Sequence, residues 1–502
     1  MKLRTAGLAI LVLVVAVAAS LSVRAQQTPQ NPPDPAARAA RPSEPAHTRK
    51  AEVGWHVATP DQSYASIDGD HLKQYVEDLT AMARRYRDNG HPQFWGRIIG
   101  TEADAENARW MMDKFRQIGL TDVREQSFDL PPQWMPQSWS VTAANRAKTL
   151  PLQTAQPTYQ SQGTTGEGLD LEAVYVGMGS DADIAMSHDV KGKAVFFFST
   201  DVNSRHIGVM DNAIKRLGDR GAAAIFVIQG IQGNLKTQFY PVNSPVPTFS
   251  LGQADGLAMR DLIAQGGTEA TRVKVKLDVQ HVPNLKTGTV WATLPGMTDE
   301  TVLVVSHRDG WFEGANDNAS GVATAIGIAE YFAKIPKEQR RRTIVFLGTT
   351  GHHNSTAESG TWFAQHPETF AKTALLLNAE HTGAVATGVG STRMANYGAP
   401  ATWFASGDRL SDIVSRALDT FGVATYPQSA ATPAGEIGRY FQLAPAMQVM
   451  TSGYVWHSDQ ETAASISTTA LAGITRAYAK VIADTMTVDL RDLRGPQRTQ
   501  QQ

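Results

Sequence analysis

His307, Asp309 and Asp317 lie close together in the sequence. They follow an apolar run that predicts a buried strand over residues 301–306. His307 and Asp309 would lie at the C-terminal end of that strand, where open α/β sheets place ligands and catalysts. Because residues i and i+2 share one face of a strand, the Asp309 carboxylate can accept a hydrogen bond from the imidazole and orient it. Asp317 follows in a glycine-flanked loop before a predicted helix, where the backbone can approach a bound ion.

The elements that would position these residues alternate between buried strands and helices after residue 286. Strands are predicted over residues 301–306, 343–347 and 374–377, and helices over residues 318–334 and from about residue 357. Near-continuous apolar strands between helices predict a mainly parallel sheet with helices on both faces. The predicted fold class is α/β.

Two domains are predicted in the mature chain. Two amphipathic helices, starting at Asp70 and at Glu102, open the larger domain, which takes residues 49–168 and 286–490. Residues 169–285 contain short apolar runs separated by Gly and Asp, which indicates an inserted β-rich domain with some helix. Residues 491–502 are predicted to be a flexible tail.

The first 48 residues carry an export signal and a linker. Lys2 and Arg4 precede an apolar run over residues 8–19 and a small-residue cleavage site, so residues 1–25 are predicted to be a signal peptide. The alternative is an uncleaved anchor, but the apolar run is shorter than the roughly 20 residues that span a bilayer. Residues 26–48 are rich in Pro, Ala and Gln and are predicted to be a disordered linker.

Composition restricts the chemistry and the partners. The 46 Lys+Arg residues balance 48 Asp+Glu residues, and no long basic stretch exists, so nucleic acid is not an expected partner. The chain has no cysteine, which leaves His and carboxylate side chains as metal ligands. An exported protein without disulfides is expected to be periplasmic or secreted, with no stable membrane anchor.

These features resemble metallopeptidase family 28, which includes zinc aminopeptidases, glutamate carboxypeptidases and catalytically inert transferrin receptors. The resemblance covers nearly the whole mature chain. Residues 97–102 (RIIGTE) look like the N-terminal signature of that family, and residues 190–195 (VKGKAV) and 221–224 (GAAA) look like its protease-associated insertion.

The resemblance implies roles for His307, Asp309 and Asp317. His307 would be a ligand of one zinc ion, and Asp317 would be the carboxylate that bridges two zinc ions. Asp309 would be the acid that orients the imidazole.

The resemblance also implies two more ligands further along the chain. Residues 376–380 (LLNAE) match the strand that supplies another carboxylate, with Glu380 where Asp is commoner, and residues 454–459 (YVWHSD) match the segment of the last ligand, His457. We expect His307, Asp317, Glu380 and His457 to converge. His381 is expected to point away from Glu380 and to be structural.

The sequence departs from the family after the strand at residues 342–346. The family has two adjacent glutamates there, the first a general base and the second a zinc ligand, whereas this chain has His352 and His353. A neutral imidazole can bind zinc and can accept a proton near neutral pH, so His352 is expected to be the base and His353 a ligand. Replacing glutamate by histidine removes negative charge at the metal. The number of bound zinc ions therefore stays open and could be two, one or none.

The expected function is that of a metal-dependent exopeptidase acting on the free end of a peptide. Zinc would polarise the scissile carbonyl, a metal-held water would attack, and His352 would take its proton. An aminopeptidase is preferred over a carboxypeptidase because it is the commoner activity of the family. The alternative is a catalytically degenerate binding or assembly protein with the same fold. The sequence leaves side-chain specificity and oligomeric state open.

Overall fold

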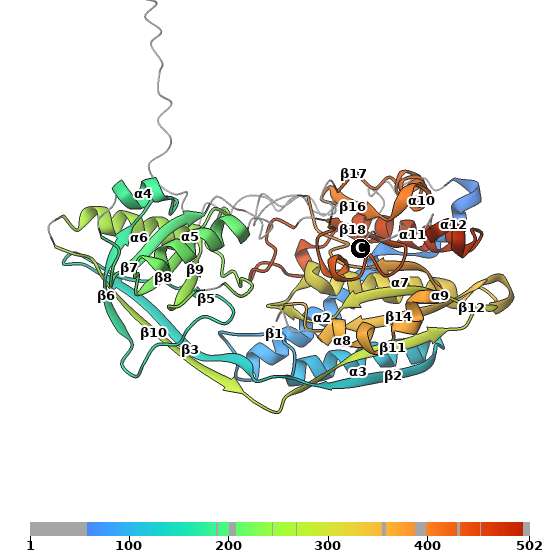
Figure 1. Cartoon of the computed structure of the whole chain (residues 1–502), viewed down its shortest axis with the longest axis horizontal. Coiled ribbons are helices and arrows are strands. Elements are labelled where there is room, and N and C mark those ends of the chain that lie inside the picture. Colours follow the sequence, from blue (N-terminus) through green and yellow to red (C-terminus); the bar gives the residue numbers. More distant parts are fainter. Residues whose placement is uncertain are drawn as a thin grey trace, which may run out of the picture. The chain divides into compact units, whose positions relative to one another are not determined.

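The computed structural model describes residues 58–186, 189–199, 207–242, 244–267, 269–353, 358–386, 398–428, 432–451 and 453–494 (Figure 1). The predicted signal peptide (residues 1–25) and linker (residues 26–48) lie outside the described residues. Among the helices in these ranges, none is both long and apolar enough to cross a membrane.

One sheet, here called the large sheet, is formed mostly by the segments predicted to be buried strands. In the described residues its order is β17-β16-β18-β15-β12-β14-β11-β2. The central strands β14, β12, β15 and β18 run parallel, whereas β11 pairs antiparallel with β14 and β2, and β16 pairs antiparallel with β18 but parallel with β17. The predicted α/β fold class is confirmed, with a parallel centre inside a mixed sheet. The strands are β2 (Thr121–Asp129), β11 (Lys286–Leu294), β12 (Thr298–His307), β14 (Arg342–Thr349), β15 (Thr373–Asn378), β16 (Ala401–Ala405), β17 (Thr425–Pro427) and β18 (Ala446–Thr451).

Helices cover both faces of the large sheet because its central strands are apolar on both sides. Val302 and Val304 of β12 face one core, and Leu303 and Val305 face the other. The first core contains side chains of α2 (Gly69–Asp88), α3 (Glu102–Ile118), α7 (Gly321–Ala333), α10 (Gly407–Thr420) and α11 (Thr468–Thr485). The second contains side chains of α8 (Glu358–Gln365) and α9 (Pro367–Lys372).

A second sheet, here called the small sheet, contains the predicted insertion and earlier strands as well. Its order in the described residues is β4-β3-β10-β6-β7-β8-β9-β5, and β6 to β9 run parallel between α5 and α6 (Figure 1). Its elements are β3 (Gln133–Ala144), β4 (Thr149–Pro151), β5 (Gln156–Pro157), β6 (Leu169–Tyr175), α4 (Asp181–Met186), β7 (Ala194–Ser199), α5 (Ile207–Asp219), β8 (Ala224–Gln229), β9 (Thr248–Leu251), α6 (Gln253–Gln265) and β10 (Arg272–Val282).

Two predicted boundaries differ from the observed elements. The small sheet begins at residue 133 rather than 169, because β3 pairs with β10 along its whole length. The predicted tail at residues 491–502 begins with the end of a helix, α12 (Leu490–Arg494), in which Leu493 is buried against the first core.

Short elements complete the described chain. The strands β1 (Gly96–Arg97) and β13 (Gly310–Trp311) pair antiparallel with each other. The short helical turns are η1 (Thr59–Ser66), η3 (Ala315–Ser320), η4 (Lys337–Gln339), η6 (Glu436–Arg439) and η7 (Ala463–Ser465).

The core of the large sheet predicts a large cost for truncating β14. Phe346 is fully buried, and its ring lies 5.6 Å from the ring of Phe115 on α3. We expect Phe346→Ala to lower the free energy of unfolding by about 3–5 kcal/mol, measured by urea denaturation. The exposed Met297 is the control, since Met297→Ala should change that free energy by no more than about 0.5 kcal/mol. Equal effects of the two substitutions would contradict the assigned core.

Candidate metal centre

The predicted site residues follow neighbouring parallel strands at one edge of the large sheet. His307 ends β12, and its partner in the register is Thr349, the last residue of β14, which precedes His352 and His353. Asn378 ends β15 and precedes Glu380. The carboxyl ends of parallel strands meet at one edge, so these side chains come together although they are distant in sequence.

Asp317 occupies the centre of this group of side chains. It lies in η3, and its Oδ1 is 3.2 Å from His307 Nε2. Its Oδ2 lies 3.2 Å from His353 Nε2 and 2.8 Å from His457 Nε2. One carboxylate therefore contacts imidazoles on both of its oxygens, which is the arrangement required of a bridging ligand.

Asp309 lies behind two of these imidazoles. Its Oδ1 is 3.4 Å from His307 Nδ1, and its Oδ2 is 3.1 Å from His353 Nδ1. The same Oδ2 accepts a hydrogen bond of 3.0 Å from the backbone N–H of His353. Asp309 can therefore orient both rings so that each Nε2 faces Asp317.

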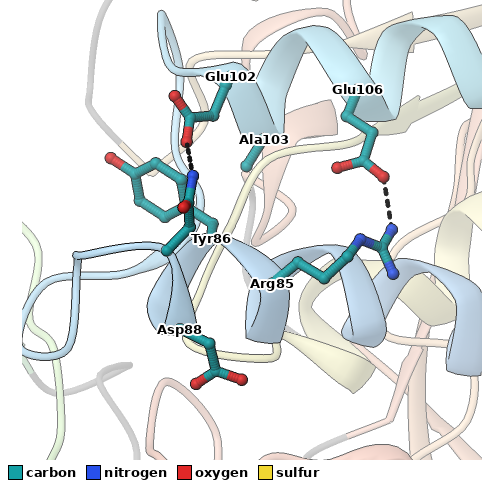
Figure 2. A pocket seen from close by; sticks show the side chains of 7 residues that line it. Arg85, Tyr86, Asp88, Glu102, Ala103 and Glu106 are labelled. Carbon is teal, nitrogen blue, oxygen red and sulfur yellow. Dashed lines mark hydrogen bonds and ion pairs between the residues drawn. The ribbon is translucent and has the colours of Figure 1, made fainter.

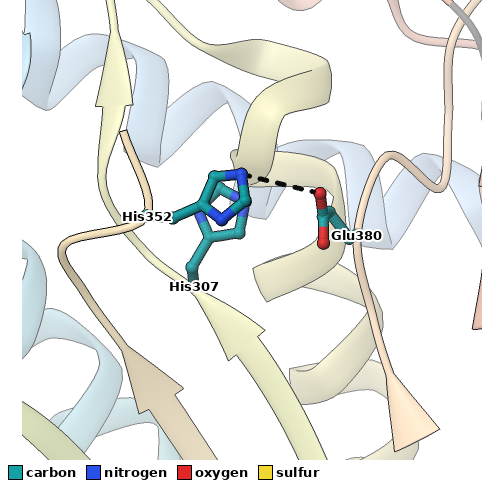
Figure 3. A group of neighbouring side chains, drawn as sticks. All are labelled: His307, His352 and Glu380. Carbon is teal, nitrogen blue, oxygen red and sulfur yellow. Dashed lines mark ion pairs between the residues drawn. The ribbon is translucent and has the colours of Figure 1, made fainter. Parts of the chain in front are cut away.

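His352 and Glu380 also lie beside His307, as Figure 3 shows. His352 Nε2 lies 3.9 Å from Glu380 Oε1, and its ring stacks on the His307 ring at 4.3 Å. Glu380 Oε2 accepts hydrogen bonds from Asn378 Nδ2 and from the backbone N–H of Glu436. The carboxylate is therefore fixed beside both imidazoles.

The loop before Glu436 leaves no room for a side chain at Gly435. A Cβ there would lie 2.6 Å from Glu380 Oε2, and Gly435 has a φ of +75°, so glycine is required on both counts.

Three groups of described residues place one possible ligand atom each within 4.8 Å of one another. They are Asp317/His353/His457, His307/His352/Glu380 and His307/Asp309/His353. Contacts of 2.8–3.2 Å around Asp317 approach the separation of about 3.3 Å between two ligands of a tetrahedral zinc ion with bonds of about 2.0–2.1 Å.

Unsatisfied polar atoms also fit a metal. The Nε2 atoms of His307, His353 and His381 and Asp317 Oδ1 are buried and have no hydrogen-bond partner. Buried polar atoms are normally paired, so their convergence is accounted for by an ion that they would hold.

Charges inside the site separate the imidazoles into two classes. Burial opposes protonation of His353, but the carboxylates of Asp317 and Asp309 outweigh it and raise its pKa to about 9. Burial lowers the pKa of His457 to about 4, against the attraction of Asp317. Burial also lowers the pKa of His352, to about 3, and the neighbouring His307 adds to this effect. Adjacent histidines therefore differ, because only His353 lies between two carboxylates.

The expectation for His381 was wrong. Its Nε2 lies 3.1 Å from Asp317 Oδ2 and 3.9 Å from Glu380 Oε1, so the ring points into the centre. His381 follows β15 with a φ of +53°, in the left-handed region, and the alternation of side chains along a strand does not extend to such a residue.

Three further residues at the centre were not found from the sequence. Trp456 Nε1 donates to Asp317 Oδ2, and Glu461 Oε1 accepts the backbone N–H of Asp317 at 2.6 Å. Tyr240, which precedes β9 of the small sheet, places its Oη 3.0 Å from His352 Nε2. Trp456 and Glu461 flank the predicted ligand His457, which is a weak signal, whereas no local pattern indicated Tyr240.

A surface pocket between α2 and α3 contains no candidate ligand group (Figure 2). Its walls carry an ion pair of 2.5 Å between Arg85 and Glu106 and a hydrogen bond from Asn89 to Glu102. Two pairs of its polar side chains thus contact each other, whereas the three groups of possible ligands lie at the strand ends.

Comparisons with known proteins agree with this location. A model of Peptidase family M28 matches residues 289–482, which include every residue of the three ligand groups. No curated protein matches the chain.

Solved structures show the same fold at low sequence identity. The zinc aminopeptidase BSAP from Bacillus subtilis has 15% identity and a TM-score of 0.61, over 83% of this chain and 95% of that chain. An aminopeptidase from Aneurinibacillus sp. strain AM-1 has 16% identity and a TM-score of 0.57, over 84% and 95%. A peptidase M28 precursor from Shewanella amazonensis SB2B has 16% identity and a TM-score of 0.66, over 86% and 99%. Residues 289–482 of the chain thus resemble Peptidase family M28, and the described residues have a fold similar to that of the zinc aminopeptidases.

Proposed function

We propose that this protein is a metal-dependent exopeptidase, and specifically an aminopeptidase, that hydrolyses the peptide bond at a free chain end. The observation that carries the proposal is the Asp317 carboxylate, whose two oxygens face different imidazoles within one buried cluster. The preference for an aminopeptidase is supported by the activity named for the Bacillus subtilis and Aneurinibacillus structures. The apolar segment near the N-terminus supports export to the periplasm or the medium.

The ligand atoms suit zinc, and we propose two ions that share Asp317. His353 and His457 would hold one ion, and His307 and Glu380 the other. Imidazole and carboxylate ligands favour zinc over the hard cations Ca²⁺ and Mg²⁺. When bound, zinc supplies Lewis acidity toward a carbonyl oxygen and lowers the pKa of water.

The remaining side chains are proposed to orient groups and to move a proton. Asp309 keeps His307 and His353 aimed at Asp317. His352 Nδ1 is buried without a hydrogen-bond partner, and we propose that this nitrogen accepts the proton of the attacking water. Peptide hydrolysis needs no further cofactor.

The adjacent histidines are predicted to respond differently to truncation. His353→Ala should lower the zinc content of the purified protein, because it removes a nitrogen that faces Asp317. His352→Ala should keep the metal but lower kcat by about 10² to 10⁴, the usual loss for a general base. Zinc is measured by mass spectrometry, turnover with an aminoacyl reporter, and His281→Ala, at an exposed position of β10, is the control.

A variant with glutamate at both positions tests the alternative function. His352→Glu combined with His353→Glu should preserve or raise activity. If the natural protein binds no stoichiometric zinc, manganese or cobalt and cleaves no reporter, while the double variant gains both properties, the protein is a degenerate scaffold.

Zinc affinity is predicted to rise between pH 7 and about pH 9. Below that pH the metal-free protein carries a proton on His353, because its pKa is raised to about 9, and this proton must leave when an ion binds. His457, with a pKa of about 4, is already neutral at pH 7 and releases none. Calorimetric titration with zinc in buffers of different ionisation enthalpy should show proton release at pH 7 that decreases toward pH 9. Release that does not change over this range would contradict the assignment.

A further inference from the structure

Tyr240 reaches the metal centre from the part of the chain that forms the small sheet. It lies between β8 and β9, and its Oη is 3.0 Å from His352 Nε2. Its ring lies 5.1 Å from the ring of His457 and stacks parallel to the ring of His353 at 6.1 Å. The phenol therefore stands beside the group formed by Asp317, His353 and His457.

The backbone before Tyr240 is fastened to the loop that carries His457. The N–H of Gln238 donates to the carbonyl oxygen of His457 at 2.9 Å, and Thr237 forms an antiparallel bridge with Ser458. The N–H of Asp459 donates to the carbonyl oxygen of Lys236 at 3.0 Å. Tyr240 and His457 therefore hold a fixed distance from each other.

His352 is badly placed to share an ion with His307, which leaves it available to Tyr240. The two rings are stacked, with 20° between their planes. Nitrogen lone pairs lie in the ring plane, so those of stacked rings run side by side instead of converging on one ion. His352 Nδ1 is buried without a partner, whereas Nε2 faces Tyr240 Oη.

The hydroxyl of Tyr240 is a phenol, which can donate one hydrogen bond and accept another. Burial raises its pKa well above the usual value, and the nearby carboxylates of Asp317 and Glu380 raise it further. If His352 donates from Nε2–H to Oη, the Tyr240 O–H can donate to another acceptor while His352 Nδ1 accepts a proton.

The group Asp317/His353/His457 could supply three ligands to an ion, and the Tyr240 ring lies beside that group. We propose that Tyr240 is a catalytic residue whose O–H donates to the carbonyl oxygen of the scissile bond as negative charge develops on that oxygen. This inference rests on the proposed peptidase function. Tyr240 keeps its proton throughout, and His352 fixes the position of Oη.

The substitution Tyr240→Phe tests this role, because it removes the hydroxyl and keeps the ring. We expect kcat for an aminoacyl reporter to fall by about 10² to 10³, the loss found when one oxyanion donor is removed, with little change in KM. Zinc content and Tm should stay at the values of the natural protein. Tyr426→Phe, at an exposed position on β17, is the matched control and should not alter kcat.

A second measurement does not depend on turnover. An aminoalkyl phosphonate has a tetrahedral anionic centre, and its affinity for the zinc-loaded protein is measured by calorimetry. We expect Tyr240→Phe to weaken its binding by about 10² to 10³, as for kcat, because the donor acts on the transition state.

The outcomes separate this inference from the proposed function. A natural protein that cleaves no reporter contradicts the peptidase proposal, and the phosphonate titration then decides the role of Tyr240. Equal phosphonate affinity in the natural protein and Tyr240→Phe overturns the inference. Loss of zinc in Tyr240→Phe, in proportion to the loss of kcat, overturns it as well, because the hydroxyl would then act on metal binding.

Discussion

The buried carboxylate of Asp317 is the constraint around which the site is built. Burial opposes its ionisation, yet His353, His381 and His307 hold its pKa well below the usual range. A buried carboxylate that stays ionised must be surrounded by positive or hydrogen-bonding groups. The imidazoles around it come from the end of β12 and from the segments that follow β14, β15 and β18. They meet this requirement in the absence of an ion, and they are the same groups that would hold one.

The loop before Asp317 is held by buried arginines as well as by Glu461. Arg97, at the end of β1, donates from Nη1 to the carbonyl oxygen of Glu313 at 2.6 Å and from Nη2 to that of Gly314 at 2.9 Å. Arg308 pairs with Asp104 of α3, which in turn accepts the N–H of Gly100. The RIIGTE segment and α3 therefore fix the backbone between His307 and Asp317, which explains why a motif without metal ligands belongs to this site.

The site residues that follow predicted strands could be predicted from the sequence. Those whose position depends on long-range pairing or on an unusual backbone conformation could not. His307 and Asp309 were placed by the end of β12, and in the structure His307 contacts both Asp309 and Asp317. His381 was misplaced because its left-handed backbone turns the ring inward. Tyr240 is brought to the centre by a backbone bridge to residues more than 200 positions away, and no local pattern carries that information.

The adjacent residues His352 and His353 show why residue type alone does not determine the chemical role of a side chain. The sequence presents two identical side chains where the family has two glutamates. In the fold, His353 lies between Asp309 and Asp317 and favours a proton or a cation, whereas His352 stacks on His307 beside Tyr240 and stays neutral. A glutamate at position 352 would bring a second negative charge beside Glu380, whereas the neutral imidazole of His352 does not. The hydroxyl that faces this imidazole belongs to Tyr240, so the part of the chain that forms the small sheet completes the surroundings of His352.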